Sequence, residues 1–259
     1  MDRKPVYLSS RGLRLVGDLQ HVADDALVVL CHGFTSNRYS RGRFPAVMQA
    51  LAARGISSLA FDFGGCGESD DDVLTLEGQV SDLLEVMAWA REHGYQRLGL
   101  YGHSLGGSIV LLAAARGQVQ ALAASGAATG PMHYDWQALY GAEAMKRLER
   151  EGVLPLPSER PGGVVLVGRS LLDAFAKFDQ TALLTAIHCP VLLVHGGDPQ
   201  DSEEQQLLVH TRAGLSLLPG GSRLHVVTGA GHSFVNHVDE LVDVVVEWLA
   251  GHLAAPSDG

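Results

Sequence analysis

The chain has 259 residues, of which 46% are hydrophobic and 19% charged, and this composition is typical of a folded globular protein. Its formal net charge of -10 disfavours attraction to phosphate backbones or anionic membranes, so no nucleic-acid or membrane partner is expected. The first residues lack the apolar core of a secretory signal, and no apolar run reaches membrane-spanning length. We therefore expect a cytoplasmic protein.

The three cysteines, Cys31, Cys66 and Cys189, lie far apart in the sequence. An odd number without paired spacing argues against a disulfide framework and against a zinc site. Three reduced thiols and no metal or cofactor are the expectation. The sequence leaves the oligomeric state open, a homodimer included.

In chain order, two short β-prone runs at 6–8 and 13–19 flank a turn cluster and predict an opening hairpin. Strands are then predicted at 27–31, 56–61, 98–101 and 121–125, and helices at 44–53, 83–89 and 104–116. Such alternation predicts an α/β fold with a mostly parallel central sheet and helices on both faces.

The alternation breaks over residues 129–188, where prolines and aromatic residues appear and only a helix at 171–178 is predicted. It resumes with strands at 191–195 and 223–227 and helices at 203–211 and 238–252, and the tail 254–259 is expected to fray. We therefore predict one core formed by 1–128 and 189–259, with 129–188 inserted into it after the sixth strand.

The segment Gly102-His103-Ser104-Leu105-Gly106 reads G-x-S-x-G between an apolar strand and an apolar helix. In a sharp strand-to-helix turn a serine is exposed at the apex, and the flanking glycines avoid collisions of a Cβ with neighbouring backbone. Ser104 is therefore the predicted nucleophile. The alternative is a glycine-rich turn whose serine only caps the helix.

A serine nucleophile needs a base and a carboxylate that orients the base. His232 is the predicted base, because it follows the last predicted strand in a glycine-rich loop. Asp198 follows the strand at 191–195 and is the preferred acid, while Asp201 and an acid elsewhere remain open. The alternative role of either aspartate is to cap the next helix.

Two backbone amides must stabilise the oxyanion that forms during acyl transfer. Leu105, directly after the nucleophile, is the first predicted donor, and Phe34 in the His32-Gly33-Phe34 loop is the second. His32 is expected to stabilise that loop rather than to act as a base. Asp62 and Glu68 are likewise expected to stabilise loops.

These motifs together resemble the α/β-hydrolase family over nearly the whole chain. The segments 32–38, 61–69 and 102–107 are most similar to cinnamoyl/feruloyl esterases and serine-aminopeptidase-like hydrolases. The resemblance implies that 129–188 is a small helical cap over the acyl pocket. The chain departs from the family pattern after His195, where Pro199 stands in the usual place of the acid.

The sequence thus predicts a cofactor-independent serine hydrolase that cleaves small-molecule carboxylic esters through an acyl-enzyme. Trp136, Tyr140 and Phe175 are candidate walls of the acyl pocket, although burial in an ordinary core would explain them equally well. By resemblance, esters of short-chain or aromatic acids are expected, with hydroxycinnamates as the most specific case. Thioesters, amides, peptides and lipids remain alternatives, as does a non-catalytic binding protein.

Overall fold

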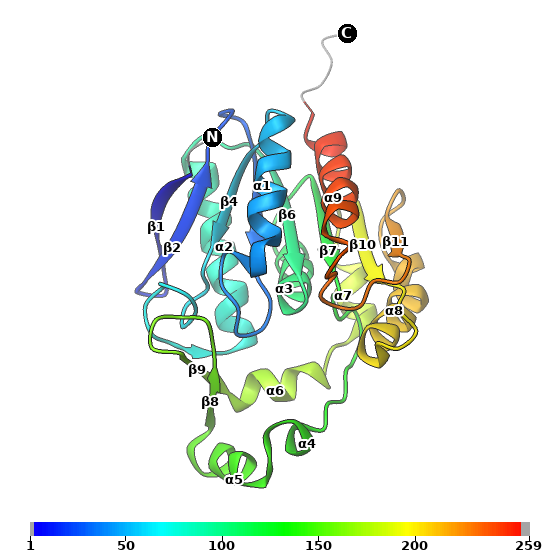
Figure 1. Cartoon of the computed structure of the whole chain (residues 1–259). Helices are drawn as coiled ribbons and strands as arrows, with labels where there is room; N and C mark the ends of the chain where they lie inside the picture. Colours follow the sequence, from blue (N-terminus) through cyan, green and yellow to red (C-terminus); the bar gives the residue numbers. More distant parts are fainter. Residues whose placement is uncertain (1–2, 255–259) are drawn as a thin grey trace.

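The computed structural model describes residues 3–254 of the chain. Its core is an eight-stranded sheet with the strand order β1-β2-β4-β3-β6-β7-β10-β11 (Figure 1). The strands are β1 (Lys4–Ser10), β2 (Leu13–Gln20), β3 (Ala26–Cys31), β4 (Ser57–Phe61), β6 (Arg97–His103), β7 (Ala121–Ser125), β10 (Val191–Gly196) and β11 (Arg223–Val227). Pairing is antiparallel from β1 to β2 and from β2 to β4, and parallel between all other neighbours, which confirms the expected mostly parallel sheet.

The opening hairpin closes through a two-residue turn of Arg11 and Gly12 between the paired residues Ser10 and Leu13. Both turn residues have positive φ, 51° and 81°. This conformation matches the right-handed twist of the two strands. The predicted hairpin is therefore confirmed, and the turn is shorter than the predicted four-residue cluster.

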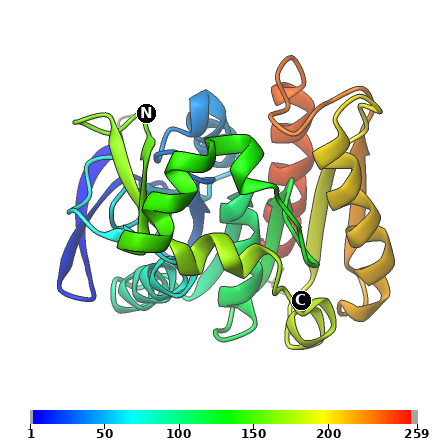
Figure 2. The same ribbon diagram turned by 90° about the horizontal axis from the view of Figure 1, so that it is seen from below.

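Helices cover both faces of the sheet (Figure 2). The helices of the core are α1 (Arg43–Ala53), α2 (Leu76–Glu92), α3 (Leu105–Ala114), α8 (Ser202–Gly214) and α9 (Val238–Leu253). Since successive strand residues point to opposite faces, Val28 and Leu30 pack with α1 and α9, while Leu27 and Val29 pack with α2 and α3. Both faces of the central strands are therefore buried, as their continuous apolar runs predict.

The segment between β7 and β10 lies at the end of the sheet where the parallel strands finish (Figure 1). It contains α4 (Trp136–Tyr140), α5 (Ala142–Glu151), β8 (Val153–Pro157), β9 (Val164–Gly168), α6 (Arg169–Phe175) and α7 (Gln180–Thr185). β8 and β9 form a hairpin that joins β5 (Val73–Leu74) in a second sheet, with the order β5-β9-β8. The insertion thus contains helices, as expected, and also a β-hairpin that the sequence did not predict.

The missed hairpin has the two-residue period of a half-buried strand pair. Leu154 and Leu156 are buried on β8, and Val165 and Val167 are buried on β9. The two prolines of β8, Pro155 and Pro157, argue against a strand in the sequence, but β8 is an edge strand, where a missing N–H is tolerated.

Cys31, Cys66 and Cys189 are buried and unpaired, as expected. Within residues 3–254, no helix is long and apolar enough to cross a membrane. The C-terminal tail that was expected to fray lies, apart from Ala254, outside the described residues.

Candidate active site

Ser104 occupies the turn between β6 and α3 in a strained backbone conformation, with φ 58° and ψ -126°. A non-glycine residue rarely adopts positive φ. The two motif glycines make the turn possible, because a Cβ on Gly102 would lie 2.1 Å from the carbonyl oxygen of Gly106, and one on Gly106 would lie 2.0 Å from that of Cys31. The predicted strand-turn-helix setting of Ser104 is confirmed.

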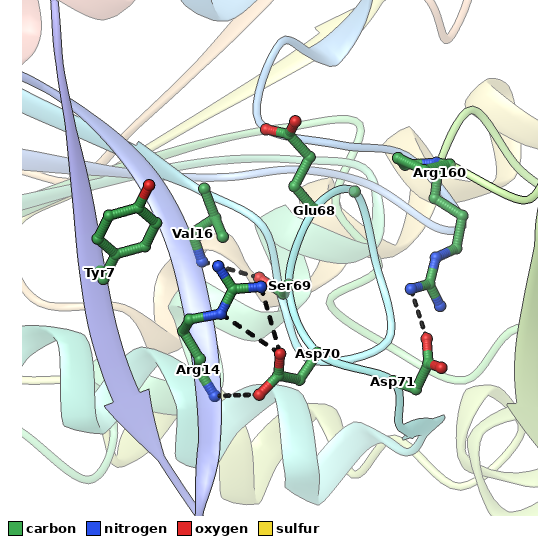
Figure 3. Close-up of a pocket in the computed structure, with 10 residues that line it drawn as sticks. Tyr7, Arg14, Val16, Glu68, Ser69, Asp70, Asp71 and Arg160 are labelled. Atoms are coloured by element: carbon green, nitrogen blue, oxygen red, sulfur yellow. Dashed lines mark hydrogen bonds and ion pairs between the residues drawn. The ribbon is translucent and has the colours of Figure 1, made fainter.

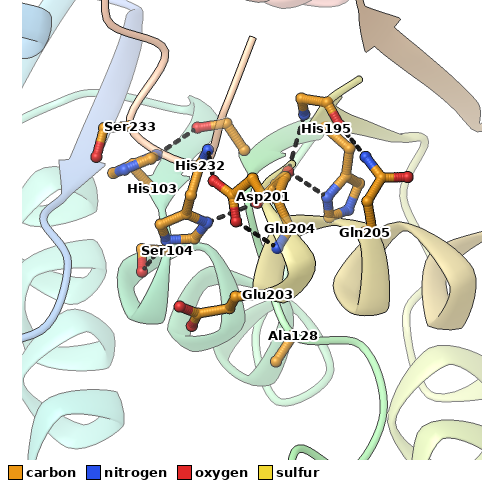
Figure 4. Close-up of polar contacts among 12 residues, drawn as sticks. His103, Ser104, Ala128, His195, Asp201, Glu203, Glu204, Gln205, His232 and Ser233 are labelled. Atoms are coloured by element: carbon orange, nitrogen blue, oxygen red, sulfur yellow. Dashed lines mark hydrogen bonds and ion pairs between the residues drawn. The ribbon is translucent and has the colours of Figure 1, made fainter. Parts of the chain in front are cut away.

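His232 reaches Ser104 from the loop between β11 and α9. Its Nε2 atom lies 2.9 Å from Ser104 Oγ (Figure 4). The backbone N–H of His232 donates to Asp201 Oδ2 at 2.7 Å, which holds the loop in place. Gly126 makes room for the imidazole, because a Cβ there would lie 2.8 Å from His232 Cε1. The sequence prediction for this pair agrees with the geometry.

The carboxylate that contacts His232 belongs to Glu204, in the first turn of α8. Glu204 Oε2 lies 2.6 Å from His232 Nδ1 (Figure 4). The other oxygen, Oε1, lies 2.8 Å from His195 Nδ1 and accepts a hydrogen bond from Gly196 N, also at 2.8 Å. Glu204 is completely buried, so both oxygens depend on these protein donors.

The preference for Asp198 as the acid is therefore wrong. Its carboxylate accepts a hydrogen bond from Gln200 N at 2.9 Å and makes no contact with His232 in the described structure. The alternative, Asp201, caps α8 by accepting from Glu204 N at 3.0 Å, and it binds only the backbone N–H of His232. Asp198 therefore stabilises the loop, and Asp201 caps α8, which is the alternative role that the sequence allowed.

Glu204 was not predicted as the acid, because the expected place of the acid is the loop after β10. The loop turns into α8, and the carboxylate reaches His232 from the helix. A signal was present in the helical spacing, since Glu204 shares the buried side of α8 with Leu207, Leu208 and Thr211. A glutamate on an apolar helix stripe is unusual unless it is paired.

These contacts shift the pKa values of Glu204 and His232 in the opposite directions that favour an ion pair between them. Burial raises the pKa of Glu204, but hydrogen bonds from His195 and His232 outweigh it and lower the pKa to about 2. Burial lowers the pKa of His232, but the hydrogen bond and charge of Glu204 outweigh it, and the pKa of His232 lies above its ordinary value. The imidazole can thus take up a proton beside an ionised carboxylate.

The two amides predicted to stabilise an oxyanion belong to segments that meet at Ser104. Leu105 is the first residue of α3, and the loop before Phe34 approaches the serine so closely that a Cβ on Gly33 would lie 3.7 Å from Ser104 Oγ. Within the part of the chain that the structure describes, neither amide donates to a protein acceptor. Both N–H groups are therefore available for a ligand.

Residues that were expected to support the loops do so. His32 is buried, with Nδ1 2.9 Å from Gly33 O and Nε2 accepting from Phe63 N at 3.3 Å. Asp62 accepts from Arg38 N at 2.6 Å and from Glu68 N at 2.9 Å, and both Asp62 and Glu68 form ion pairs with Arg38. Their side chains are thus engaged in structural contacts.

A cavity of about 440 Å³ opens at Ser104 and His232. Its remaining lining comes from the loop after β3, the residues at and just before the start of α1, the end of β6, the residue after His232 and the tip of the β8–β9 hairpin: Gly33, Phe34, Thr35, Ser36, Arg41, Arg43, His103, Ser233, Pro157, Ser158 and Glu159. The hairpin is held against the loop by two hydrogen bonds, from Ser158 Oγ to Thr35 O and from Asn37 Nδ2 to Glu159 Oε2, each 3.1 Å long. The inserted segment thus forms one wall of the cavity.

The three aromatic residues predicted to wall the acyl pocket do not line the cavity at Ser104. The prediction that they form its wall is therefore wrong. Trp136, Tyr140 and Phe175 pack with Tyr134 in an aromatic cluster. Phe175 also packs against Phe34, with ring centroids 6.4 Å apart. The rings of this cluster pack against one another in stacked, tilted and edge-to-face pairs, and Phe34 is the aromatic residue of the cavity wall.

A second cavity lies beside the opening hairpin (Figure 3). Each of its charged side chains has a partner: Arg14 pairs with Asp70, Arg160 with Asp71, and Glu68 with Arg38 outside the cavity. Neither a nucleophile with a base nor an unpaired charge lies in it. Among residues 3–254, no group of three His, Cys, Asp or Glu side chains is arranged to hold a metal ion.

The fold and the Ser104 turn define an α/β protein with a serine at a strained strand-to-helix turn. The chain belongs to the alpha/beta hydrolase family, whose sequence model matches residues 28–246. It is also 36% identical over 107 residues to an uncharacterized 31.7 kDa protein from the traX-finO intergenic region of Escherichia coli. That match covers 39% of this chain and only 35% of the relative's length.

Solved structures with the same fold include several hydrolases. Est1E of Butyrivibrio proteoclasticus with bound ferulic acid is 20% identical, with a TM-score of 0.73 over 96% of this chain and 100% of that one. GrgF, an alpha/beta hydrolase of Penicillium sp. sh18, is 18% identical, with a TM-score of 0.77 over 98% and 100% of the two chains. The Pyrococcus furiosus esterase Pf2001 is 20% identical, with a TM-score of 0.68 over 98% and 94%.

Proposed function

We propose that this protein is a serine hydrolase that cleaves carboxylic esters with a Ser104-His232-Glu204 triad. The observation that carries the proposal is the continuous path from nucleophile to base to acid, with separations of 2.9 Å and 2.6 Å. The first distance lets the imidazole accept the serine proton, and the second lets the carboxylate orient the imidazole by a hydrogen bond. The glutamate performs the orienting role for which an aspartate was expected.

In the proposed reaction, Ser104 Oγ attacks the ester carbonyl while His232 Nε2 accepts its proton. The amides of Leu105 and Phe34 donate to the oxyanion of the tetrahedral intermediate. His232 then protonates the leaving alcohol oxygen, and an acyl-enzyme remains on Ser104. A water molecule, deprotonated by His232, attacks the acyl carbonyl and releases the acid. In every step Glu204 accepts a hydrogen bond from Nδ1–H of His232, and it stabilises the imidazolium whenever it forms.

The cavity favours a small acyl group. About 440 Å³ lies at the low end of the range of ligand pockets, and Phe34 supplies its aromatic surface. The shared fold with Est1E, which binds ferulic acid, motivates a hydroxycinnamate ester as the aromatic candidate. We propose segment 129–188 as the cap, since the tip of its hairpin contributes Pro157, Ser158 and Glu159 to the wall.

The decisive experiment is hydrolysis of p-nitrophenyl esters from acetate to laurate, with methyl ferulate, by the natural protein and Ser104→Ala. A fluorophosphonate probe is applied to both proteins, because its reaction requires an activated serine. We expect turnover of the short esters and labelling of the natural protein, both lost in Ser104→Ala. Labelling without ester turnover would indicate that the substrates are thioesters or amides. Absence of both, in folded protein, would indicate a non-catalytic ligand-binding role.

A further inference from the structure

Arg43, the first residue of α1, lines the same cavity as Ser104 and His232 and has no carboxylate partner. Its side chain is only 6% exposed. Among residues 3–254, no acidic oxygen lies within 4.0 Å of its guanidinium. Burying a charge without a counterion is costly, so buried arginines are normally paired.

Arg38 shows how this protein treats a buried arginine elsewhere. It is also 6% exposed, but its guanidinium contacts Asp18, Asp62 and Glu68. Three carboxylates therefore surround the guanidinium of Arg38, whereas no carboxylate of the described residues contacts the guanidinium of Arg43. The difference lies in position, because Arg43 faces the candidate active site and Arg38 does not line it.

The guanidinium of Arg43 is held in place by neutral acceptors and keeps unused donors. Nη1 donates to Ser233 O at 2.8 Å and Nη2 to Ser40 Oγ at 3.2 Å, whereas buried Nε has no partner in the described structure. An arginine has five N–H donors, so these contacts leave donors available. Nη1 therefore binds the backbone of the residue that directly follows the candidate base. Burial lowers the pKa of Arg43, which reflects the missing counterion.

We propose that Arg43 binds a carboxylate of the substrate, so that the natural ester carries a negative charge a few bonds from its scissile carbonyl. This inference rests on the proposed function and narrows its substrate class. A carboxylate would supply the counterion and accept charge-assisted hydrogen bonds. Arg41 adds a second positive charge to the cavity, and Glu159, 4.0 Å from Arg41 and exposed, partly offsets it at the edge. Arg43, with no such neighbour, is the principal anchor.

The test compares esters that differ in charge but hardly in shape. The pairs are 4-acetoxybenzoate with 4-acetoxybenzamide, and p-nitrophenyl hydrogen adipate with p-nitrophenyl hexanoate, which place the carboxylate on the alcohol side and on the acyl side. Affinity is measured by calorimetry with Ser104→Ala, so the readout needs no turnover, and kcat/KM is measured with the natural serine. We expect at least one anionic ester to be favoured about tenfold or more in both measurements.

Arg43→Met should abolish this preference, and Arg43→Lys should retain part of it. Arg54→Met, at the opposite end of α1 and outside the cavity, is the matched control and should leave the preference unchanged. If Arg43 only anchors the Ser233 loop, Arg43→Met will lower activity on both members of a pair equally. That result, or equal binding of anionic and neutral esters by Ser104→Ala, would overturn the inference. Turnover of neutral esters alone would leave the proposed function intact.

Discussion

The Oε2 atom of Glu204 lies 2.6 Å from Nδ1 of His232, although the two residues are 28 positions apart, one on α8 and the other in the loop between β11 and α9. The same carboxylate uses Oε1 to bind His195 and the backbone of Gly196. Glu204 therefore joins the end of β10, the start of α8 and the loop of His232. A buried carboxylate with every oxygen engaged is rigid, and rigidity of the acid determines the orientation of the base.

The first prediction concerns this acid. Glu204→Gln should lower kcat by roughly 10³- to 10⁴-fold, because the amide can present the wrong hydrogen-bonding partner to His232 and stabilises no imidazolium. Asp198→Asn should change kcat less than twofold, since its carboxylate bonds only Gln200 N. Steady-state kinetics on a short ester measure both. Circular dichroism must show that each variant is folded.

Asp201→Asn is the informative control for the same experiment. An asparagine retains an oxygen that can cap α8, but it offers one acceptor where Asp201 serves both Glu204 N and His232 N. We expect a loss of about tenfold or less, between the other two variants. Should Asp198→Asn or Asp201→Asn prove more damaging than Glu204→Gln, Glu204 would not be the acid.

The proposed nucleophile and base could be predicted from sequence because each is part of a short local pattern. A Cβ on Gly102 would collide with Gly106 in the same turn and one on Gly106 with the end of β3, and His232 stands in a glycine-rich loop after the last strand. The acid could not be predicted in the same way. Its position depends on how α8 packs against the sheet, which is a tertiary property, and Asp201 and Glu204 look in sequence like an ordinary helix cap.

The inserted segment shows a second limit of prediction from sequence. The aromatic character of residues in this segment predicts that they line the acyl pocket. Trp136 and Phe175 instead pack against one another, with ring centroids 5.8 Å apart. The cavity is walled by the polar tip of a hairpin, and this tip is positioned by contacts of Ser158 and Glu159 with a loop more than a hundred residues earlier. Such long-range pairing leaves no local pattern.

The second prediction is the pH dependence of catalysis. His232 must be neutral to accept the serine proton, and its pKa in the free enzyme is raised by Glu204. The acidic limb of kcat/KM should therefore lie above the ordinary imidazole value of 6.5. In Glu204→Gln burial is opposed only by the weaker effects of Glu203 and Asp201 on the pKa of His232, so the limb of the residual activity should move to lower pH. A limb that stays in place would show that Glu204 does not control His232.

The third prediction concerns stability in acid. The folded-state pKa of Glu204 is about 2, below the ordinary 4.5, so the ionised carboxylate stabilises the fold above pH 4.5. This contribution is lost as the pH falls from 4.5 towards 2. Urea unfolding between pH 6 and 3 should show a smaller decrease in Glu204→Gln than in the natural protein. An equal decrease in both would contradict the assigned shift.

The fourth prediction assigns His195 as a positioning residue behind Glu204. Its ring is fully buried, with Nδ1 2.8 Å from Glu204 Oε1 and Nε2 2.8 Å from Thr211 Oγ1. His195→Ala should lower the free energy of unfolding by about 2–4 kcal/mol and kcat by roughly tenfold, because Glu204 and Thr211 lose their partner. Thr211→Val removes the contacts of Thr211 with His195 and Thr129 but leaves the contact between His195 and Glu204, so it should reduce stability while leaving kcat within twofold. Equal losses of kcat in both variants would indicate a purely structural role.

The final prediction concerns the glycines that shape the nucleophile turn. In Gly106→Ala the new methyl group would lie 2.0 Å from the carbonyl oxygen of Cys31 and 2.5 Å from that of His32, so it collides with backbone that cannot move aside as a side chain could. The turn must open, so esterase activity and fluorophosphonate labelling should both fall by at least a hundredfold even where the protein remains folded. Gly251→Ala on α9 meets no atom within 4 Å and should instead stabilise the helix by about 0.5–1 kcal/mol. Unfolding curves and labelling rates of the two variants separate the effects. Gly106→Ala with natural labelling would show that the strained geometry of Ser104 is not required for its reactivity.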